Sequence, residues 1–206
     1  MLPRLYRTRQ WLLLLLCLTA LPAYGDALTR LSQVLAGISS YRADFVQQIY
    51  NQDQQLVQQS EGTLTAARPG KLRWLSEAPY EQLIVVDGTN IWRYEEDLQQ
   101  VVVSGYSEDL GSTPALLLSG NVDSIGARYS VSEVDGQYQL LPRDEQSLFR
   151  AMMVRFEDGK LTQLVLEDTL GQTTKLVLTN IEQNPTLDPA LFEFVPPEGV
   201  DVLRDE

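Results

Sequence analysis

Short polar turns separate most of the apolar segments of this sequence, and this spacing constrains the fold more than any other feature. Asp87-Gly88, Asp135-Gly136 and Asp158-Gly159 each lie between two segments in which apolar and polar residues alternate. An Asp-Gly pair between two such segments is typical of a tight β-hairpin. Strands joined by tight hairpins are antiparallel neighbours. The sequence therefore predicts a mainly β protein with one antiparallel sheet.

About ten or eleven strands are expected along the chain. They are predicted at residues 41–50, 54–67, 72–75, 83–86, 91–94, 101–103, 128–134, 137–141, 148–157, 161–167 and 173–181. A sheet with so many strands has to curl, close or split. The simplest architecture is one long, curled sheet, and no repeat or linker divides the chain into further domains.

Two short helices are expected beside the strands. Leu28, Leu31 and Leu35 recur at helical spacing ahead of the first strand. Residues 112–118 begin with Ser, Thr and Pro, which favour a helix start, and end in the three leucines Leu116, Leu117 and Leu118.

The first 25 residues are typical of a cleaved signal peptide. Arg4 and two further arginines precede an apolar run at residues 11–21, and the small residues Ala23 and Gly25 follow. The run is short for a bilayer span, which disfavours the alternative of an uncleaved membrane anchor. We therefore expect an exported protein, with residues 26–206 forming one domain.

The single cysteine, Cys17, lies inside the apolar run, and Asp26 occupies the first position after the expected cleavage site. A lipoprotein signal places a cysteine at that position, so the exported chain is expected to carry no lipid of its own. It would also contain no cysteine, and packing rather than disulfide bonds would have to stabilise it.

The composition excludes several classes of function. The chain has no histidine, which removes the commonest general base and the commonest metal ligand. Its carboxylates fall mostly in turns, and no spacing resembles a metal or phosphate site. We expect no enzyme activity, catalytic residue, metal or cofactor. The net charge of −12 argues against nucleic acid and anionic membranes as partners, although solubility alone would explain it equally well.

Alternation along the strands predicts one apolar and one wet face. The residues assigned to the apolar face, and hence to a cavity or its mouth, are Leu72, Trp74, Trp92, Tyr94, Met152, Val154, Phe156, Leu164 and Leu166. Two short helices offer limited cover for so wide a face. The pattern leaves two alternatives open, an ordinary core under the helices and a concave binding cavity.

Several segments together resemble the periplasmic outer-membrane lipoprotein carrier family, LolA. The resemblance covers most of residues 26–206, and the order and spacing of the segments make it specific. They are residues 41–48 (YRADFVQQ), 61–64 (EGTL), 68–74 (RPGKLRW), 86–94 (VDGTNIWRY), 113–120 (TPALLLSG) and 192–200 (FEFVPPEGV).

The resemblance implies an unclosed, half β-barrel of about eleven antiparallel strands, with short α-helices forming a lid over an apolar cavity for lipoprotein acyl chains. It implies that Arg68 hydrogen-bonds to the backbone of the lid and holds the empty cavity shut. Leu72 would lie at the cavity mouth, where the family often has Phe, and Leu116, Leu117 and Leu118 would be apolar residues of the lid helix.

The resemblance also implies a monomeric shuttle that takes lipoproteins from the inner-membrane transporter LolCDE and passes them to the outer-membrane acceptor LolB. Two alternatives come from other classes. A periplasmic sensor such as the RseB family has the same half-barrel but an additional domain. A hydrolase is disfavoured by the absence of histidine. The LolB acceptor itself needs a lipidated N-terminal cysteine.

Overall fold

A computed structural model describes residues 24–106 and 114–204, and its main feature is one twelve-stranded sheet. The strands are β1 (Ser40–Tyr50), β2 (Leu56–Ala67), β3 (Lys71–Ala78), β4 (Gln82–Asp87), β5 (Asn90–Glu95), β6 (Gln100–Gly105), β7 (Tyr129–Val134), β8 (Gln137–Pro142), β9 (Phe149–Glu157), β10 (Lys160–Asp168), β11 (Thr173–Gln183) and β12 (Asp201–Arg204). All eleven predicted strands are present.

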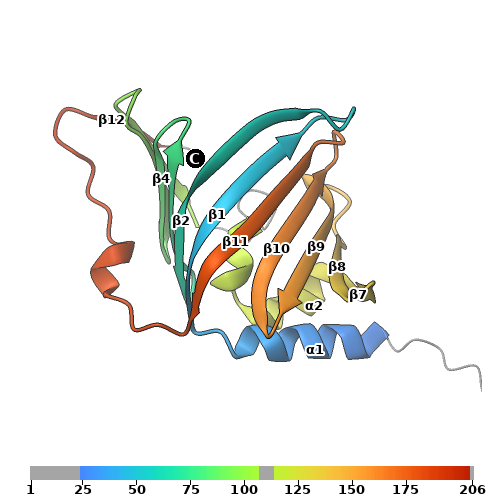
Figure 1. Cartoon of the computed structure of the whole chain (residues 1–206). Helices are drawn as coiled ribbons and strands as arrows, with labels where there is room; N and C mark the ends of the chain where they lie inside the picture. Colours follow the sequence, from blue (N-terminus) through green and yellow to red (C-terminus); the bar gives the residue numbers. More distant parts are fainter. Residues whose placement is uncertain (1–23, 107–113, 205–206) are drawn as a thin grey trace, which may run out of the picture.

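The strand order is β12-β6-β5-β4-β3-β2-β1-β11-β10-β9-β8-β7. Two antiparallel meanders therefore meet where β1 pairs with β11. The sheet curls strongly but leaves β12 and β7 as separate edges, so it forms an unclosed half-barrel (Figure 1). The prediction of a mainly β, curled sheet is confirmed. The twelfth strand was not predicted, and its pairing with β6 is parallel.

The hairpin turns follow from their residues. Asp135 and Asp158 have φ of 51°, and Gly136 and Gly159 follow with φ of 73° and 75°. Two successive residues with positive φ match the right-handed twist of a hairpin, and Asp-Gly tolerates that backbone well. These two turns join β7 to β8 and β9 to β10, as expected.

Helix α1 (Tyr24–Ala36) lies across one end of the half-barrel (Figure 1). A second helical segment follows β6 and comprises η1 (Pro114–Leu118), η2 (Val122–Ser124) and α2 (Ile125–Arg128). We call residues 114–128 the lid. The expected helix at 112–118 is a 3-10 helix over its described part. Its expected start at Ser112 and Thr113, and residues 1–23 of the expected signal peptide, lie outside the described residues.

The core lies between the concave face of the sheet, α1 and the lid. Leu31 and Leu35 from α1 have no solvent exposure. In the middle of the sheet, Phe45 on β1 stacks on Trp74 on β3 with their ring centroids 3.8 Å apart. Burying a large apolar side chain contributes about 1.5–3 kcal/mol, so this continuous cluster is the main source of stability.

A last segment leaves β11, crosses the convex face through η3 (Pro189–Phe192) and ends in β12 (Figure 1). η3 contacts β3 and β4. The two faces of this half of the sheet are thus covered by different parts of the chain, the lid inside and this segment outside.

Candidate functional site

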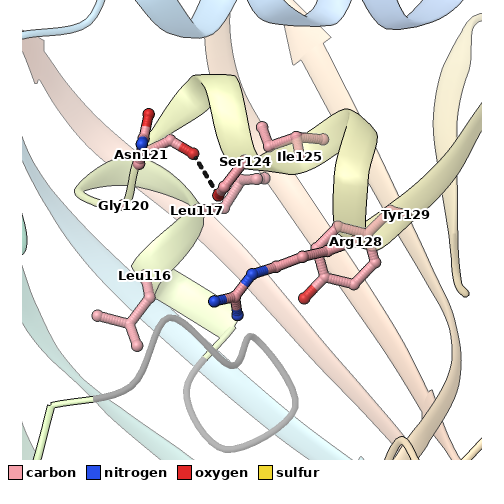
Figure 2. Close-up of a pocket in the computed structure, with 8 residues that line it drawn as sticks. All are labelled: Leu116, Leu117, Gly120, Asn121, Ser124, Ile125, Arg128 and Tyr129. Carbon is pink, nitrogen blue, oxygen red and sulfur yellow. Dashed lines mark hydrogen bonds between the residues drawn. The ribbon is translucent and has the colours of Figure 1, made fainter. Parts of the chain in front are cut away.

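The lid fills the concave side of the half-barrel with apolar side chains. Leu116, Leu117 and Leu118 are 0%, 3% and 1% exposed and belong to the same cluster as the inner face of the sheet. One cavity between the lid and Tyr129 measures about 20 Å³, enough for a single water. Figure 2 shows its lining from η1 to Tyr129. An acyl chain can enter the inner face only if the lid moves away.

Arg68 is the residue that ties the lid to the sheet. It follows β2, in the turn where Pro69-Gly70 predicted a reversal of the chain. Its Nη2 donates to the carbonyl of Leu117 at 2.9 Å, and its Nη1 donates to the carbonyl of Gly120. The planar guanidinium suits such a task because its donors point in fixed directions. One side chain thereby donates hydrogen bonds to two backbone carbonyls of the same lid turn.

The same guanidinium also contacts the junction between α1 and β1. Arg68 Nε donates to the carbonyl of Ile38 at 2.9 Å, and the backbone N–H of Arg68 donates to the carbonyl of Ser39, also at 2.9 Å. Burial lowers the pKa of Arg68, while the nearby Tyr106 raises it. An arginine remains cationic under such a shift. Each hydrogen bond of the guanidinium is therefore charge-assisted and worth roughly 1.5–3 kcal/mol.

A backbone contact adds to the arginine. The N–H of Gly70 donates to the carbonyl of Ser119 at 2.7 Å. Gly70 has φ of 64°, and a Cβ there would come within 3.3 Å of the Tyr106 ring. Glycine suits this position because the turn needs both a left-handed backbone and a close approach. The 68–70 turn is thus the point at which the sheet holds the lid.

A family model described as outer membrane lipoprotein carrier protein LolA matches residues 36–195. This stretch contains the inner-face strands, the 68–70 turn and the lid. The chain belongs to the LolA family.

Curated relatives agree over nearly the full length. An outer-membrane lipoprotein carrier protein of Nitrosomonas europaea is 38% identical over 200 residues, covering 94% of this chain and 97% of the relative. The same protein of Hahella chejuensis is 40% identical over 181 residues, covering 85% and 87%. Both relatives are therefore named as lipoprotein carriers.

Solved structures support the fold. A LolA superfamily protein from Nitrosomonas europaea superposes with a TM-score of 0.53 at 11% identity, covering 83% of this chain and 97% of that one. A DUF1329 family protein from Desulfovibrio piger gives 0.54 at 14% identity, covering 83% and 96%. The half-barrel fold of this chain is therefore also found in these two solved structures.

Seven of the nine residues assigned to the cavity lie on the inner face. They are Leu72, Trp74, Met152, Val154, Phe156, Leu164 and Leu166. Six of them are at most 7% exposed, and Phe156 is partly buried against the same cluster. Leu72 has no exposure, so in this closed arrangement it lies in the core beneath the lid rather than at an open mouth.

The assignment of Trp92 and Tyr94 to the cavity is wrong. Trp92 is opposite Val85 on β4, and Val85 is opposite Arg73 on β3, so all three point to the convex face. Tyr94 shares that face. Both rings contact Phe194 in the C-terminal segment, at centroid distances of 5.7 and 6.0 Å. Alternation places residues on a common face of a strand, but only the register with β4 decides which face looks inward.

Sequence reasoning missed two inner-face aromatics on β1. Phe45 stacks on Trp74, and Tyr41 is fully buried with its hydroxyl donating to the carbonyl of Leu161 at 2.7 Å. Burial raises the pKa of Tyr41, so the phenol stays neutral. The alternation of Tyr41, Ala43 and Phe45 was the available indication, since these residues occupy every second position.

Across residues 24–106 and 114–204, no group of three or more Asp, Glu, Cys or His side chains is arranged to bind a metal ion. Within the same residues, no helix has the length and apolar character needed to cross a bilayer. The family is one of carriers, which supports the expectation that this chain is not an enzyme.

Proposed function

We propose that this protein carries lipoproteins through the periplasm by enclosing their acyl chains between the lid and the inner face of the half-barrel. The observation that carries the proposal is the combination of LolA family membership with an apolar inner face closed by a hydrogen-bonded lid. Relatives named as outer-membrane lipoprotein carriers cover nearly the whole chain, which supports lipoproteins as the cargo.

The energetics favour a lid of this kind. Each buried CH₂ contributes about 0.8 kcal/mol, so one long acyl chain could contribute on the order of 10 kcal/mol. A carrier that bound with this full energy would release its cargo slowly. Opening the lid removes three leucines from the core and breaks the Arg68 hydrogen bonds to the carbonyls of Leu117 and Gly120, which opposes cargo binding. Arg68 would thus reduce the net affinity to a level at which an acceptor can compete.

The route of the cargo is part of the same proposal. We infer that residues 1–25 direct export and are removed, that residues 26–206 act as a single soluble domain in the periplasm, and that the carrier works as a monomer. It would receive lipoproteins from the inner-membrane transporter LolCDE and deliver them to LolB at the outer membrane.

The alternative of a periplasmic regulator is not favoured, because the curated relatives that match most of this chain are named as carriers.

Native mass spectrometry tests the proposal directly. The protein purified from a periplasmic extract is expected to retain acylated polypeptide, and the emptied protein should bind a synthetic dipalmitoylated lipopeptide but not the same peptide without its acyl chains. Equal binding of the two peptides would contradict the proposal. Recovery of a phospholipid or glycolipid in place of acylated polypeptide would indicate a carrier of another lipid.

A further inference from the structure

The inner face ends in a polar groove at the side remote from α1. The groove has a volume of about 380 Å³. Its floor comes from β1 to β5, and its rim comes from the β3–β4 and β5–β6 connections, which contribute Tyr80 and Leu98. Tyr80 is 72% exposed and Leu98 is 64% exposed, so the rim presents apolar surface to solvent.

A row of polar side chains forms the floor of this groove. Gln47 is opposite Ser60, Ser76 is opposite Gln82, and Gln82 is opposite Glu95. Within the row, Ser60 Oγ donates to Gln47 Oε1 at 3.2 Å, and Gln82 Nε2 donates to Glu95 Oε1 at 3.1 Å. These amide, hydroxyl and carboxylate groups lie on five neighbouring strands, with a shift between β2 and β3, where Ser76 is opposite Gly62 rather than Ser60.

This row is continuous with the apolar interior. Leu72, Trp74 and Ser76 occupy successive inner-face positions of β3, and Trp74 Nε1 donates to Ser76 Oγ at 3.0 Å. The indole ring faces Phe45 while its N–H faces the groove. The inner face thus changes from apolar to polar between Trp74 and Ser76, two residues apart on β3.

An acylated polypeptide changes its chemistry in the same way at its lipidated end. We infer that the groove binds the first peptide units of the cargo while the acyl chains occupy the space under the lid, an inference that rests on the proposed function. Glutamine amides offer both donors and acceptors, which match a peptide backbone. The exposed apolar rim would contact the side chains of the bound segment.

The charges of the groove add selectivity against other acyl-chain compounds. Glu81, Glu95 and Asp97 line it, and among the residues that the structure describes no lysine or arginine does. A phosphodiester head group would place a negative charge beside these carboxylates, whereas a neutral peptide would not. Membrane phospholipids carry the same acyl chains as lipoproteins, so the head group is the feature by which a carrier can distinguish them. The groove therefore selects acylated polypeptide over anionic phospholipid.

Removing the charges tests the selectivity. The probes are a dipalmitoylated hexapeptide without charged side chains and dipalmitoyl phosphatidylglycerol, whose acyl chains are identical. We define the selectivity ratio as the Kd for phosphatidylglycerol divided by the Kd for the lipopeptide, and we expect it to exceed one. The combined variant Glu81→Gln, Glu95→Gln, Asp97→Asn should lower this ratio by roughly tenfold. The ratio should also fall with rising salt, because the carboxylates are partly or fully exposed.

A matched control changes the net charge equally outside the groove. Glu145, Glu157 and Glu198 are all exposed, and their combined change to Gln should leave the ratio unaltered. The selectivity inference is overturned if both triple variants change the ratio alike, or if neither does.

Photo-crosslinking tests the location of the peptide. A benzoylphenylalanine at Leu98 should crosslink to the bound lipopeptide, whereas one at Val195, which is 83% exposed on the C-terminal segment, should not. If the lipopeptide binds by mass spectrometry but crosslinks equally from both positions, the groove is not its site and the proposed function stands. If the lipopeptide does not bind, both proposals fail.

Discussion

The backbone N–H and the hydroxyl of Ser39 both donate to Asn184 Oδ1, at 2.8 and 3.0 Å. The Asn184 Nδ2 in turn donates to the carbonyl of Gly37 at 2.9 Å. Asn184 lies just after β11, so the start of the C-terminal segment holds the bend between α1 and β1. That bend contains Ile38, whose carbonyl accepts from Arg68 Nε. Asn184, near the C-terminal end of the chain, therefore positions the Ile38 carbonyl that accepts a hydrogen bond from Arg68.

Asn184→Ala should consequently destabilise the fold and loosen the Arg68 contacts. Several hydrogen bonds to one exposed amide are lost, and we expect the free energy of unfolding to fall by about 2 kcal/mol. Urea denaturation followed by circular dichroism measures it. Asn180→Ala is the matched control, since Asn180 also has a positive φ (49° against 58°) but its amide contacts only Asp44. Equal losses in both variants would mean that backbone conformation alone explains the effect.

Arg68→Leu should bind lipoprotein more tightly and transfer it poorly. The variant loses the hydrogen bonds that favour the closed lid, and a loss of 1.5–3 kcal/mol per bond corresponds to at least about tenfold stronger retention. Transfer of a labelled lipoprotein to LolB in vitro measures the effect. Arg73→Leu serves as the control, because Arg73 makes a single long hydrogen bond to the Leu191 carbonyl on the convex face. Unchanged transfer by Arg68→Leu would refute the role of the arginine.

Local signals made most of the fold predictable from the sequence. The Asp135-Gly136 and Asp158-Gly159 turns each have two successive left-handed residues, and alternation predicts the strands on either side, so both hairpins could be predicted directly. Pro69-Gly70 placed Arg68 at the end of a strand. The resemblance to LolA, rather than its position, connected that arginine with the lid.

Features set by distant contacts were not predictable in the same way. The inner or outer orientation of Trp92 depends on register through β4. Strand β12 is short, exposed and polar at both ends, and it exists because a long connection returns it beside β6. Whether the concave face is a cavity or a core depended on Leu116 and its neighbours in the lid, which fill it.

Gly62→Ala should destabilise the sheet where two strands approach closely. A Cβ at this position of β2 would overlap the carbonyl oxygen of Leu75 and lie 2.9 Å from its carbonyl carbon. Backbone atoms cannot yield as a flexible side chain can, so we expect a loss of about 3 kcal/mol in the free energy of unfolding. Gly105→Ala, which would meet nothing within 4 Å, should change it little. Similar melting of the two variants in thermal denaturation would contradict this.

Asp87 should give the fold a dependence on acidic pH. Its carboxylate accepts from the N–H groups of Thr89 and Asn90 at 2.8 Å and from Trp92 Nε1 at 2.9 Å. Burial, the largest single influence, raises the pKa of Asp87, but these hydrogen bonds together bring it below its usual value. Because the folded-state pKa is the lower one, the stabilisation is present above the unfolded-state value of about 3.9 and is lost as the pH falls through the folded-state pKa.

The variant Asp87→Asn keeps an acceptor but carries no charge. The difference in unfolding free energy between the unchanged protein and this variant should be largest near neutral pH and should shrink below about pH 4. Denaturation at a series of pH values measures it, with Asp53→Asn controlling for net charge. A difference that stays constant down to about pH 2 would exclude the linkage.

The two tryptophans outside the expected signal peptide offer a direct readout of where acyl chains bind. Trp74 faces the interior beside Phe45, whereas Trp92 lies on the convex face against Phe194. Bromine atoms on an acyl chain quench indole fluorescence only at contact distance. A lipopeptide with brominated acyl chains should therefore quench the variant Trp92→Phe, whose fluorescence comes from Trp74, and leave Trp74→Phe bright. The substitutions preserve an aromatic ring on each face, so both variants should remain folded. Quenching of Trp92 to the same extent would show that acyl chains bind on the convex face, and it would contradict the enclosure of cargo beneath the lid.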